Sequence, residues 1–537
     1  MNPQRNPQSK MHTRRYDAYQ TPDWLQKRSE LSPQRVALID TLDRNRSITY
    51  VEWNRNANRT AHFLRDRLGV RKGDLVAVLA KNCVEYLDIW FALAKVGGVL
   101  QTLNWRLTPH EIGEMLSDSP PVALVYDGSR GNSQELGQTV QSLRGQLPSS
   151  IRFVSMSELL DAGDLSFSLR ETYPDSLPPV PDLSLEDPWV ICYTGGTTGL
   201  PKGAILSYRA VTANSINTVI SWGLTSEDVT ILNSPLFHSG GLNVFTAPLV
   251  YTGGASIVCQ EFDLEQTFDL LDQGQVSIWF GVPTMFVMMQ NHPRWKNSDF
   301  SHLKILISGG APCPLPVFER FWDKGIDFKT GYGLTEAGPN TFWLPPEQVR
   351  QKPGAVGYPL FHVEVRLVGE AGHTLGPGEV GELLIRGPHV FSGYLNNPAA
   401  TAGVFKDGWL HTGDLASYDP DGCFRIMGRL KDMIISGGEN IYPSEIENVL
   451  HALPDVVEAA VIGIPDEKWG EVGWAILFVK PDASPSETML ADFCSERLAR
   501  YKIPKRFIFV SQPLPKTGAN KVDKKALAEM YQKDART

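Results

Sequence analysis

The sequence predicts an α/β protein. We expect a large N-terminal α/β region of layered sheets with a β-rich subdomain, followed by a small α+β C-terminal domain. The chain has 537 residues, whereas single hydrophobic cores stop growing at about 250–300 residues. Short apolar runs alternate with helix-length amphipathic stretches, which is typical of α/β layering. The pattern then changes near Val363 and again after Gly428, and each change indicates a new structural unit.

In the N-terminal region, apolar runs of strand length lie beside stretches with helical periodicity. Residues 75–80 predict a buried strand, and residues 85–96 predict an amphipathic helix. A loop rich in Pro, Ser and Asp at residues 174–188 precedes a new structural unit. No fixed repeat length is present, so a solenoid is excluded. The strand pattern recurs at residues 122–126, 189–193, 276–280 and 305–308.

Downstream, the strands become shorter and alternate, with glycine-rich turns between residues 363–368 and 382–386. A helix is expected to open at Pro443, because proline in the first helical turn costs little. Ile446, Val449 and Leu450 form the apolar stripe of this helix. The remaining elements expected in the C-terminal domain are strands at 457–462, 475–479 and 507–510 and a helix over 487–499.

Composition excludes several classes of protein. Apolar residues make up 42% and charged residues 21% of the chain, which is a globular balance. The net charge of −9 argues against a dedicated nucleic-acid binder, which carries a concentrated basic face. No window is apolar and long enough to span a bilayer, and the polar residues 1–20 predict a disordered tail rather than a secretory signal. We therefore expect a cytoplasmic protein; whether Met1 or Met11 starts it is left open.

A segment rich in glycine and threonine at residues 193–203 carries the strongest chemical signal. Its glycines let backbone N–H groups approach a polyphosphate, its threonine hydroxyls add donors, and its lysine adds positive charge. The spacing matches neither a Walker A loop nor a dinucleotide-binding turn. The segment precedes a helix expected near Ser207. The predicted nucleotide-binding residues are Thr194, Gly195, Gly196, Thr197, Thr198, Gly199 and Lys202.

This segment closely resembles the phosphate-binding signature of the adenylate-forming superfamily, which includes acyl-CoA synthetases, adenylation domains of peptide synthetases and firefly luciferase. Further motifs appear in that family's order, at residues 307–312, 331–336, 409–414, 428–432 and 513–522. The resemblance implies an N-terminal adenylation domain at 21–428 and a hinge at 429–432. It also implies a mobile C-terminal lid at 433–537.

The resemblance implies roles for single residues in the motif at 331–336. Tyr332 would flank the adenine, and Thr335 would contact the α-phosphate. Glu336 would hold Mg²⁺, a hard cation that prefers a carboxylate together with phosphate oxygens. Further nucleotide contacts are implied for Gly310, Ala311, Gly331 and Gly333.

The later motifs supply the ribose site, the hinge and a catalytic lysine. Asp414 would bind the ribose hydroxyls with Arg429 beside it, and Lys431 would be the hinge residue. Lys521 falls on the family's catalytic lysine, which would neutralise charge on the carboxylate and the α-phosphate. The chain departs from the family at Asn520, where glycine is usual, but asparagine tolerates positive φ better than most residues.

The acid and its acceptor follow from two further segments. His238 stands where amino-acid-activating relatives carry Asp, and a buried, unpaired ammonium is costly, so an α-amino acid is disfavoured. The apolar surroundings favour a fatty or aryl acid. Ser436, Gly437 and Gly438 resemble the loop that borders the coenzyme A arm. The acyl pocket is implied to consist of His238, Phe280, Gly281, Gly309 and Gly333.

The resemblance thus implies a ligase that adenylates a carboxylic acid with MgATP and transfers the acyl group to coenzyme A. The catalytic residues would be Lys521, Thr335, Glu336 and His238. The short stretch after Lys521 favours free coenzyme A over a fused carrier domain. Three alternatives stay open: a ligase that loads a separate carrier protein, a non-catalytic nucleotide binder and a luciferase-like oxygenase. A homodimer is retained as one option for the assembly.

Overall fold

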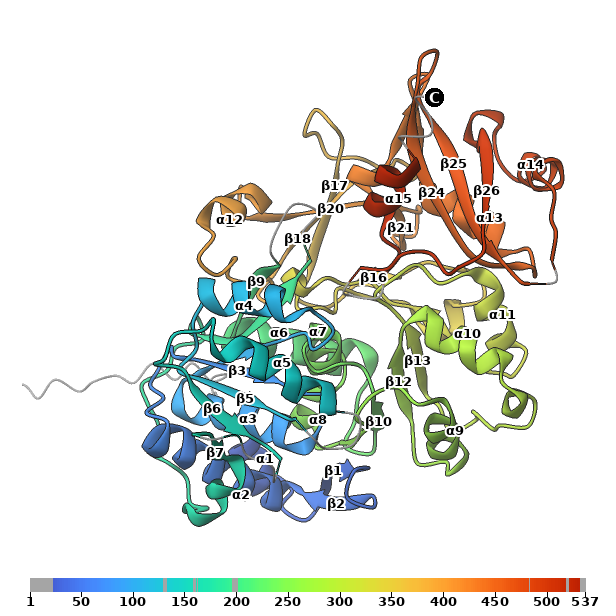
Figure 1. Cartoon of the computed structure of the whole chain (residues 1–537). Coiled ribbons are helices and arrows are strands. Elements are labelled where there is room, and N and C mark those ends of the chain that lie inside the picture. Colours follow the sequence, from blue (N-terminus) through green and yellow to red (C-terminus); the bar gives the residue numbers. More distant parts are fainter. Residues whose placement is uncertain are drawn as a thin grey trace, which may run out of the picture.

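The computed structural model describes residues 23–128, 133–157, 161, 163–195, 201–481, 483–517 and 521–531. The expected tail at residues 1–20 lies outside these ranges. The described chain forms a large N-terminal body and a smaller C-terminal unit, drawn in orange and red in Figure 1. The C-terminal helix α13 (Pro443–His451) lies beside the N-terminal helix α11 (Leu315–Trp322) and strand β21 (Phe424–Arg429).

The first sheet of the N-terminal body has seven strands, parallel except for the last pair. Its two faces pack against different helices, because successive strand residues point to opposite sides. Ala77 and Leu79 join α4 and α5 in one cluster, whereas Val76 and Val78 join α3 in another. In spatial order the strands are β7 (Leu165–Ser166), β6 (Arg152–Ser155), β5 (Ala123–Tyr126), β3 (Leu75–Leu79), β4 (Val99–Thr102), β8 (Pro188–Thr194) and β9 (Lys202–Ser207).

The second sheet also has seven strands, and only its β1–β2 pair is antiparallel. One face packs against α9, α10 and α11 through Trp279 and Phe286. The opposite face contributes Ile278 and Ile307 to the cluster that also holds Val76. In spatial order the strands are β14 (Lys329–Thr330), β13 (Ile305–Ser308), β12 (Ile278–Gly281), β10 (Val229–Leu232), β11 (Ala255–Val258), β1 (Val36–Asp40) and β2 (Arg46–Thr49).

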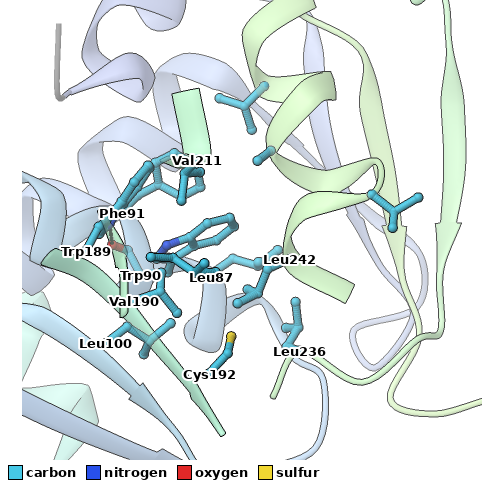
Figure 2. Close-up of a cluster of buried hydrophobic side chains, with 14 of the residues drawn as sticks. Leu87, Trp90, Phe91, Leu100, Trp189, Val190, Cys192, Val211, Leu236 and Leu242 are labelled. Carbon is cyan, nitrogen blue, oxygen red and sulfur yellow. Dashed lines mark hydrogen bonds between the residues drawn. The ribbon is translucent and has the colours of Figure 1, made fainter. Parts of the chain in front are cut away.

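The two seven-stranded sheets therefore share one core. Trp189 on β8 stacks on Tyr208 with ring centroids 5.1 Å apart, and its indole nitrogen donates to the Trp90 carbonyl at 3.2 Å. Figure 2 shows Trp90, Trp189 and Leu242 converging in this core. Burying such large rings anchors β8 firmly, and β8 leads directly into the glycine- and threonine-rich segment.

A β-rich subdomain follows, built mostly of antiparallel strands. Its five-stranded sheet comprises β17 (Glu364–Val368), β18 (Gly381–Arg386), β20 (Trp409–Tyr418), β19 (Phe405–Lys406) and β21. A separate two-stranded sheet consists of β15 (Phe342–Trp343) and β16 (Tyr358–Pro359).

The C-terminal unit is a five-stranded sheet with helices on both faces. Ala459 and Val461 of β24 pack with α13 and α14, whereas the alternate residues Ala460 and Ile462 pack with α15. This confirms the expected α+β domain. Its strands are β23 (Glu439–Ile441), β22 (Ile434–Ser436), β25 (Gly470–Val479), β24 (Val456–Asp466) and β26 (Arg506–Val510).

Helix starts follow local capping chemistry. Thr49 and Thr108 each form a capping box with the glutamate three residues later. The α-helices not yet bounded are α1 (Trp24–Leu31), α2 (Tyr50–His62), α3 (Val84–Val96), α4 (Pro109–Asp118), α5 (Gln134–Arg144), α6 (Tyr208–Trp222), α7 (Ser239–Asn243), α8 (Thr246–Thr252), α9 (Leu264–Asp272), α10 (Pro283–Asn291), α12 (Pro398–Val404), α14 (Glu487–Ser495) and α15 (Lys524–Tyr531). The short helical turns are η1 (Phe63–Arg67), η2 (Phe167–Thr172), η3 (Pro293–Lys296), η4 (Thr335–Ala337), η5 (Pro346–Gln348), η6 (Leu430–Asp432) and η7 (Arg500–Lys502).

The sequence analysis and the structure differ in three places. The helix expected near Ser207 is confirmed, because α6 begins at Tyr208 with Ser207 as its N-cap, but strand β9, which lies before this helix and pairs with β8, was not expected. That pairing satisfies backbone groups that a loop would leave to water. Strands β24 and β25 are longer than predicted, since their antiparallel ladder extends to Asp466 and Gly470. Helix α14 ends at Ser495 rather than residue 499.

Candidate active site

The β8–β9 hairpin brings two of the expected nucleotide-binding residues together. Thr194 and Lys202 face each other across the antiparallel pair. The Thr194 hydroxyl donates to Glu336 Oε1 at 3.3 Å, and Lys202 Nζ lies 5.3 Å from the centre of the Tyr394 ring. Of the other expected residues, Gly195 is exposed at the end of β8, whereas Gly196, Thr197, Thr198 and Gly199 lie outside the described residues.

The carboxylate of Glu336 is held by hydroxyl groups. Tyr394 donates to Glu336 Oε1 at 2.8 Å, the same oxygen that accepts from Thr194. Burial, followed by the charge of Glu336, raises the pKa of Tyr394, so its phenol stays a donor. Among the described residues no lysine, arginine or histidine forms an ion pair with this carboxylate. A carboxylate that is oriented but not neutralised suits a hard cation.

The segment preceding Glu336 is packed too tightly for side chains at its glycines. A Cβ on Gly333 would lie 1.6 Å from the Pro339 carbonyl oxygen, and one on Gly331 would lie 2.8 Å from Ile307. Thr335 then presents its hydroxyl 3.0 Å from that of Ser239. The glycines thus let this segment run against its neighbours and place Thr335 and Glu336 at one edge of the site.

Asp414 occupies the centre of a second polar group. Its Oδ1 lies 2.6 Å from Arg429 Nε, and its Oδ2 accepts from the Tyr332 hydroxyl at 2.6 Å. The Thr412 hydroxyl accepts from the Asp414 backbone N–H at 3.0 Å and donates to the Leu383 carbonyl. Burial raises the pKa of Asp414, whereas Arg429 and Tyr332 counteract that rise. The carboxylate is therefore oriented from both sides.

Lys521 connects these groups with the C-terminal unit. Crowding by protein atoms lowers the pKa of Lys521, and the positive charge of Arg429 adds to this effect. The negative charges of Asp414 and Glu336 act in the opposite direction. Lys521 keeps contact with solvent while the charges of Arg429, Asp414 and Glu336 act on it. A residue near the end of the chain is thus brought to residues that belong to the N-terminal body.

His238 is also close enough to Lys521 to be affected by its charge. Burial lowers the pKa of His238 to about 4, and the positive charges of Arg106 and Lys521 add to the shift. The imidazole is therefore neutral at physiological pH. Beside it, the Phe280 ring is flanked by glycines: a Cβ on Gly240 would lie 3.2 Å from the ring and one on Gly309 would lie 2.9 Å from it.

The remaining expected acyl and nucleotide positions are close by along the chain. A Cβ on Gly281 would lie 2.9 Å from Phe286. Gly310 adopts a φ of 80°, which glycine takes without strain, and its neighbour Ala311 is half-buried. Gly281 pairs with Ser308 at the neighbouring ends of β12 and β13, so these expected positions lie close together in the fold.

A recess is lined by Asn82, Trp105, Arg106, Asn233, Pro235, Gln260, Glu261, Phe262 and Met285. The Arg106 guanidinium lies 4.3 Å from the Trp105 ring centre and 5.5 Å from that of Phe237. Burial lowers the pKa of Arg106, and Glu261 opposes that shift. The recess thus combines aromatic walls with one cation.

The expected hinge and coenzyme A residues lie apart from the Asp414 group. Lys431 is exposed in η6, between the two units. Ser436 pairs with Gly470, and the Gly437 N–H donates to the Trp469 carbonyl at 2.8 Å. Gly437 and Gly438 have φ values of 61° and 88° and are exposed. Among the described residues, these backbone contacts stay within the C-terminal unit.

Several residues at the site have no sequence signal of their own. Tyr394, Thr412 and Ser239 act on Glu336, Asp414 and Thr335 only because distant segments fold together. The one available hint was that Thr412 lies inside the motif at 409–414 and that Ser239 directly follows His238. Within the described ranges no group of three or more His, Cys, Asp or Glu side chains is arranged to hold a metal ion. No helix in those ranges has the length and apolar character needed to cross a membrane.

Comparison with known proteins points the same way. Residues 25–395 match the family model described as AMP-binding enzyme, and residues 445–521 match that of the AMP-binding enzyme C-terminal domain. A feruloyl-CoA synthase of Amycolatopsis sp. is 39% identical over 93% of this chain and 96% of its own. A long-chain-fatty-acid–CoA ligase of Mycobacterium tuberculosis is 34% identical over 94% of this chain and 97% of its own. The crystal structure of ATP-bound MatB from Rhodopseudomonas palustris superposes with a TM-score of 0.85 at 30% identity, covering 96% of this chain and 99% of MatB.

Proposed function

We propose that this chain, which belongs to the AMP-binding enzyme family and is an AMP-forming acid–CoA ligase, joins an aromatic carboxylic acid to coenzyme A. The observation that supports the proposed site is that Lys521 lies close enough to Asp414 and Glu336 for their charges to act on it. In the proposed reaction the acid attacks the α-phosphate of ATP and releases pyrophosphate. The acyl adenylate then reacts with the thiol of coenzyme A and releases AMP.

We assign the nucleotide to the two polar groups joined by Lys521. Asp414, oriented by Thr412 and Tyr332, accepts the ribose hydroxyls, and Arg429 stays beside it. Lys202, Thr194 and the glycines that follow cradle the phosphates with N–H and hydroxyl donors. Tyr332 flanks the adenine. We assign Gly310, Ala311 and Gly331, which carry no side chain or a single methyl group beside the ends of β13 and β14, to the base as well.

Glu336 is the residue we assign to Mg²⁺. A single protein carboxylate fits this ion, because Mg²⁺ is bound by one or two carboxylates together with substrate phosphates. When bound, the ion supplies charge neutralisation at the phosphates. Tyr394 and Thr194 orient the carboxylate through their hydroxyls, which is the usual task of groups that surround a metal ligand.

The adenylation step requires charge neutralisation rather than a protein nucleophile. Lys521 donates to the oxygens shared between the incoming carboxylate and the α-phosphate, where negative charge accumulates. Thr335 holds an α-phosphate oxygen. His238, which is neutral because its pKa is about 4, packs beside the acid without attracting a second anion. Binding the two reactants in register supplies much of the remaining rate enhancement.

We further propose that the C-terminal unit turns about Lys431 between the two half-reactions. Its exposed position in η6 suits a residue that absorbs a change in backbone angles. The turn removes Lys521 from the site and brings Ser436, Gly437 and Gly438 to the path of the coenzyme A arm. The two glycines have no side chain to obstruct that narrow arm.

The choice of an aromatic acid rests on the walls of the acyl pocket and on the relatives. The Phe280 ring packs directly against Gly240 and Gly309, so an aromatic ring forms this wall in a position that a side chain on either glycine would block. Apolar walls favour a hydrophobic acid, and Gly281 and Gly333 pack against Phe286 and the Pro339 carbonyl. The feruloyl-CoA synthase shares more residues with this chain than the fatty-acid ligase does, which supports an aryl substrate.

A comparison of the two half-reactions tests this assignment. Lys521→Ala should reduce pyrophosphate release by about 100-fold or more but leave thioester formation from supplied acyl adenylate intact. Lys516→Ala is the matched control, because Lys516 is paired with Glu458 at 2.8 Å inside the C-terminal unit. Equal losses in both half-reactions would contradict the role of Lys521. Transfer to a carrier protein but not to free coenzyme A would identify a different acceptor.

A further inference from the structure

A second recess is lined by residues that take no part in the proposed reaction. It lies in the β-rich subdomain, where β18 ends and β19 begins, beside the first turn of α6. Its volume is about 250 Å³, whereas a cavity of about 150 Å³ is large enough to hold one benzene molecule. It therefore has room for a small organic molecule. The Arg386 recess, as we name it, is lined by Arg209, Ile385, Arg386, Gly387, Val390, Phe391, Phe405 and Gly408.

Aromatic side chains form one part of this lining. Phe391 and Phe405 stack with their ring centroids 5.4 Å apart and an angle of 22° between the ring planes. Phe391 is buried, whereas Phe405 is only half-buried, so the stacked pair offers apolar surface to a molecule in the recess. Apolar walls with a few polar groups among them are typical of small-molecule sites.

Two guanidinium groups add positive charge to the lining. Arg386 packs over the Trp409 ring, 4.4 Å from its centre, and pairs with Glu364 through Nη2. Its Nε and Nη1 have no hydrogen-bond partner among the described residues, so it retains donors for a second anion. Arg209 pairs with Glu186 at 2.8 Å. Neither glutamate belongs to the lining, so a molecule in the recess meets the cations rather than their counter-ions.

His389 lies beside the recess without a hydrogen bond of its own. It is fully buried, and in the part of the chain that the structure describes neither ring nitrogen has a partner. A Cβ on Gly387, which lines the recess, would lie 2.7 Å from His389 Nδ1. The charge of Arg209, another lining residue, acts on the imidazole. Because an unpaired buried polar group costs free energy, a bound molecule that supplies an acceptor here is favoured.

The segment that lines the recess also contacts the residue we assign to Mg²⁺. The Phe391 backbone N–H donates to the Glu336 carbonyl at 2.9 Å. The Phe391 ring meets the Tyr394 ring edge to face, with centroids 5.0 Å apart, and Tyr394 donates to Glu336 Oε1 at 2.8 Å. Chains of packed side chains and hydrogen bonds can carry coupling between two sites. A molecule that packs against Phe391 therefore acts on a residue with two connections to Glu336.

We propose that the Arg386 recess is an effector site that binds a small organic carboxylate with an apolar body and is coupled to Glu336 through Phe391. The guanidinium groups bind the carboxylate, the stacked rings pack against the body, and the His389 N–H donates to a carboxylate oxygen. An inorganic anion leaves the apolar walls uncovered, and a neutral molecule leaves the cations without a partner. Only the coupling rests on the proposed ligase function.

Photolabelling of the full-length protein with 4-azidobenzoate, followed by peptide mapping, tests the binding. Label should appear in the peptides that contain residues 385–391 and 405–408, separately from any label in the acyl pocket. Arg386→Gln should reduce the recess label by about tenfold or more, since it removes hydrogen bonds to a charged group, and leave the acyl-pocket label unchanged. Arg366→Gln is the matched control, because Arg366 also packs over the Trp409 ring, at 4.6 Å, but does not line the recess.

Competing molecules test the chemical class of the occupant. Benzoate should displace the recess label, whereas inorganic phosphate at equal ionic strength should not, and the neutral 4-azidobenzamide should label the recess weakly. Label confined to the acyl pocket, equal recess label in Arg386→Gln, or displacement by phosphate as effective as by benzoate refutes the proposal. Arg386→Lys, which keeps the charge, should retain part of the label and replaces the glutamine variant if thermal unfolding shows that the latter does not fold.

The coupling is measured as the concentration of 4-azidobenzoate that gives half-maximal recess label, with and without MgATP. Coupling between two sites is reciprocal and typically 5- to 150-fold, so MgATP should change this concentration by about fivefold or more. An unchanged concentration in a protein that binds MgATP refutes the effector role. If equilibrium dialysis shows that ATP does not bind, the proposed function fails, and the loss of recess label in Arg386→Gln still decides whether the recess binds a carboxylate.

Discussion

Replacing Tyr394 by Phe tests whether the hydroxyl groups around Glu336 prepare it for Mg²⁺. The change removes only the hydroxyl that donates to Glu336 Oε1 at 2.8 Å, and it keeps the ring that lies 5.3 Å from Lys202 Nζ. The remaining donor, Thr194, is further away at 3.3 Å, so most of the orientation is lost. A hydrogen bond to a charged group contributes about 1.5–3 kcal/mol, and loss of a partner behind a metal ligand costs about 10- to 100-fold in metal affinity.

The assay is pyrophosphate exchange measured against Mg²⁺ concentration at saturating ATP and acid. Tyr394→Phe should need about tenfold more Mg²⁺ or higher for half-maximal exchange, and excess Mg²⁺ should restore the rate. Tyr418→Phe is the control, because that hydroxyl donates to the Leu375 carbonyl at 3.2 Å and not to Glu336. If Tyr394→Phe shows the wild-type Mg²⁺ requirement, the reasoning that links this hydroxyl, Glu336 and the ion is wrong.

Two further changes probe the ribose group and the pH dependence of stability. Asp414→Asn keeps the shape of the side chain but weakens its contacts with Arg429 and Tyr332. Because charge-assisted hydrogen bonds are roughly twice as strong as neutral ones, the KM for ATP should rise by about tenfold. An unchanged KM would argue against ribose binding at this position. Burial lowers the pKa of the fully buried His389 to about 4. Between pH 6.5 and 4 the folded state therefore binds fewer protons than the unfolded state. The free energy of unfolding should fall by about 3 kcal/mol over this range because of His389. His389→Leu should remove this loss, as denaturant unfolding at pH 7 and pH 4.5 measures, and equal losses in both proteins would contradict the assignment.

Much of the fold could be predicted because local patterns carry it. The strand at 75–80 and the helix at 85–96 were found from apolar runs and periodicity, and the structure has β3 and α3 there. The changes of pattern near Val363 and after Gly428 mark the β-rich subdomain and the C-terminal unit. The strand β9 was missed because the glycine- and threonine-rich segment dominates its start, and only its pairing with β8 makes Lys202 part of a strand.

Some residues of the candidate site could be predicted from the sequence, and others could not. Glu336, Asp414 and Lys521 were selected from motifs, and the structure brings them together. Tyr394 and Asn243 were not selected, because a tyrosine after a glycine turn or an asparagine at the end of a short helix has no meaning by itself. Their positions depend on contacts with distant segments. Tyr394 donates to Glu336, and Asn214 donates to the backbone carbonyl of Asn243.

By itself the sequence determined the layered α/β architecture, the order of the motifs and the chemical types available for phosphate and carboxylate chemistry. These properties depend on residue type and on spacing along the chain, which fix local periodicity and turn formation. Only the tertiary structure decided that Lys521 lies close enough to Asp414 to be affected by its charge, that Tyr394 orients Glu336, and that the amide of Asn243 has no hydrogen-bond partner among the described residues. Burial and hydrogen-bond pairing depend on contacts between segments far apart in the chain, and such contacts exist only after the whole core has packed.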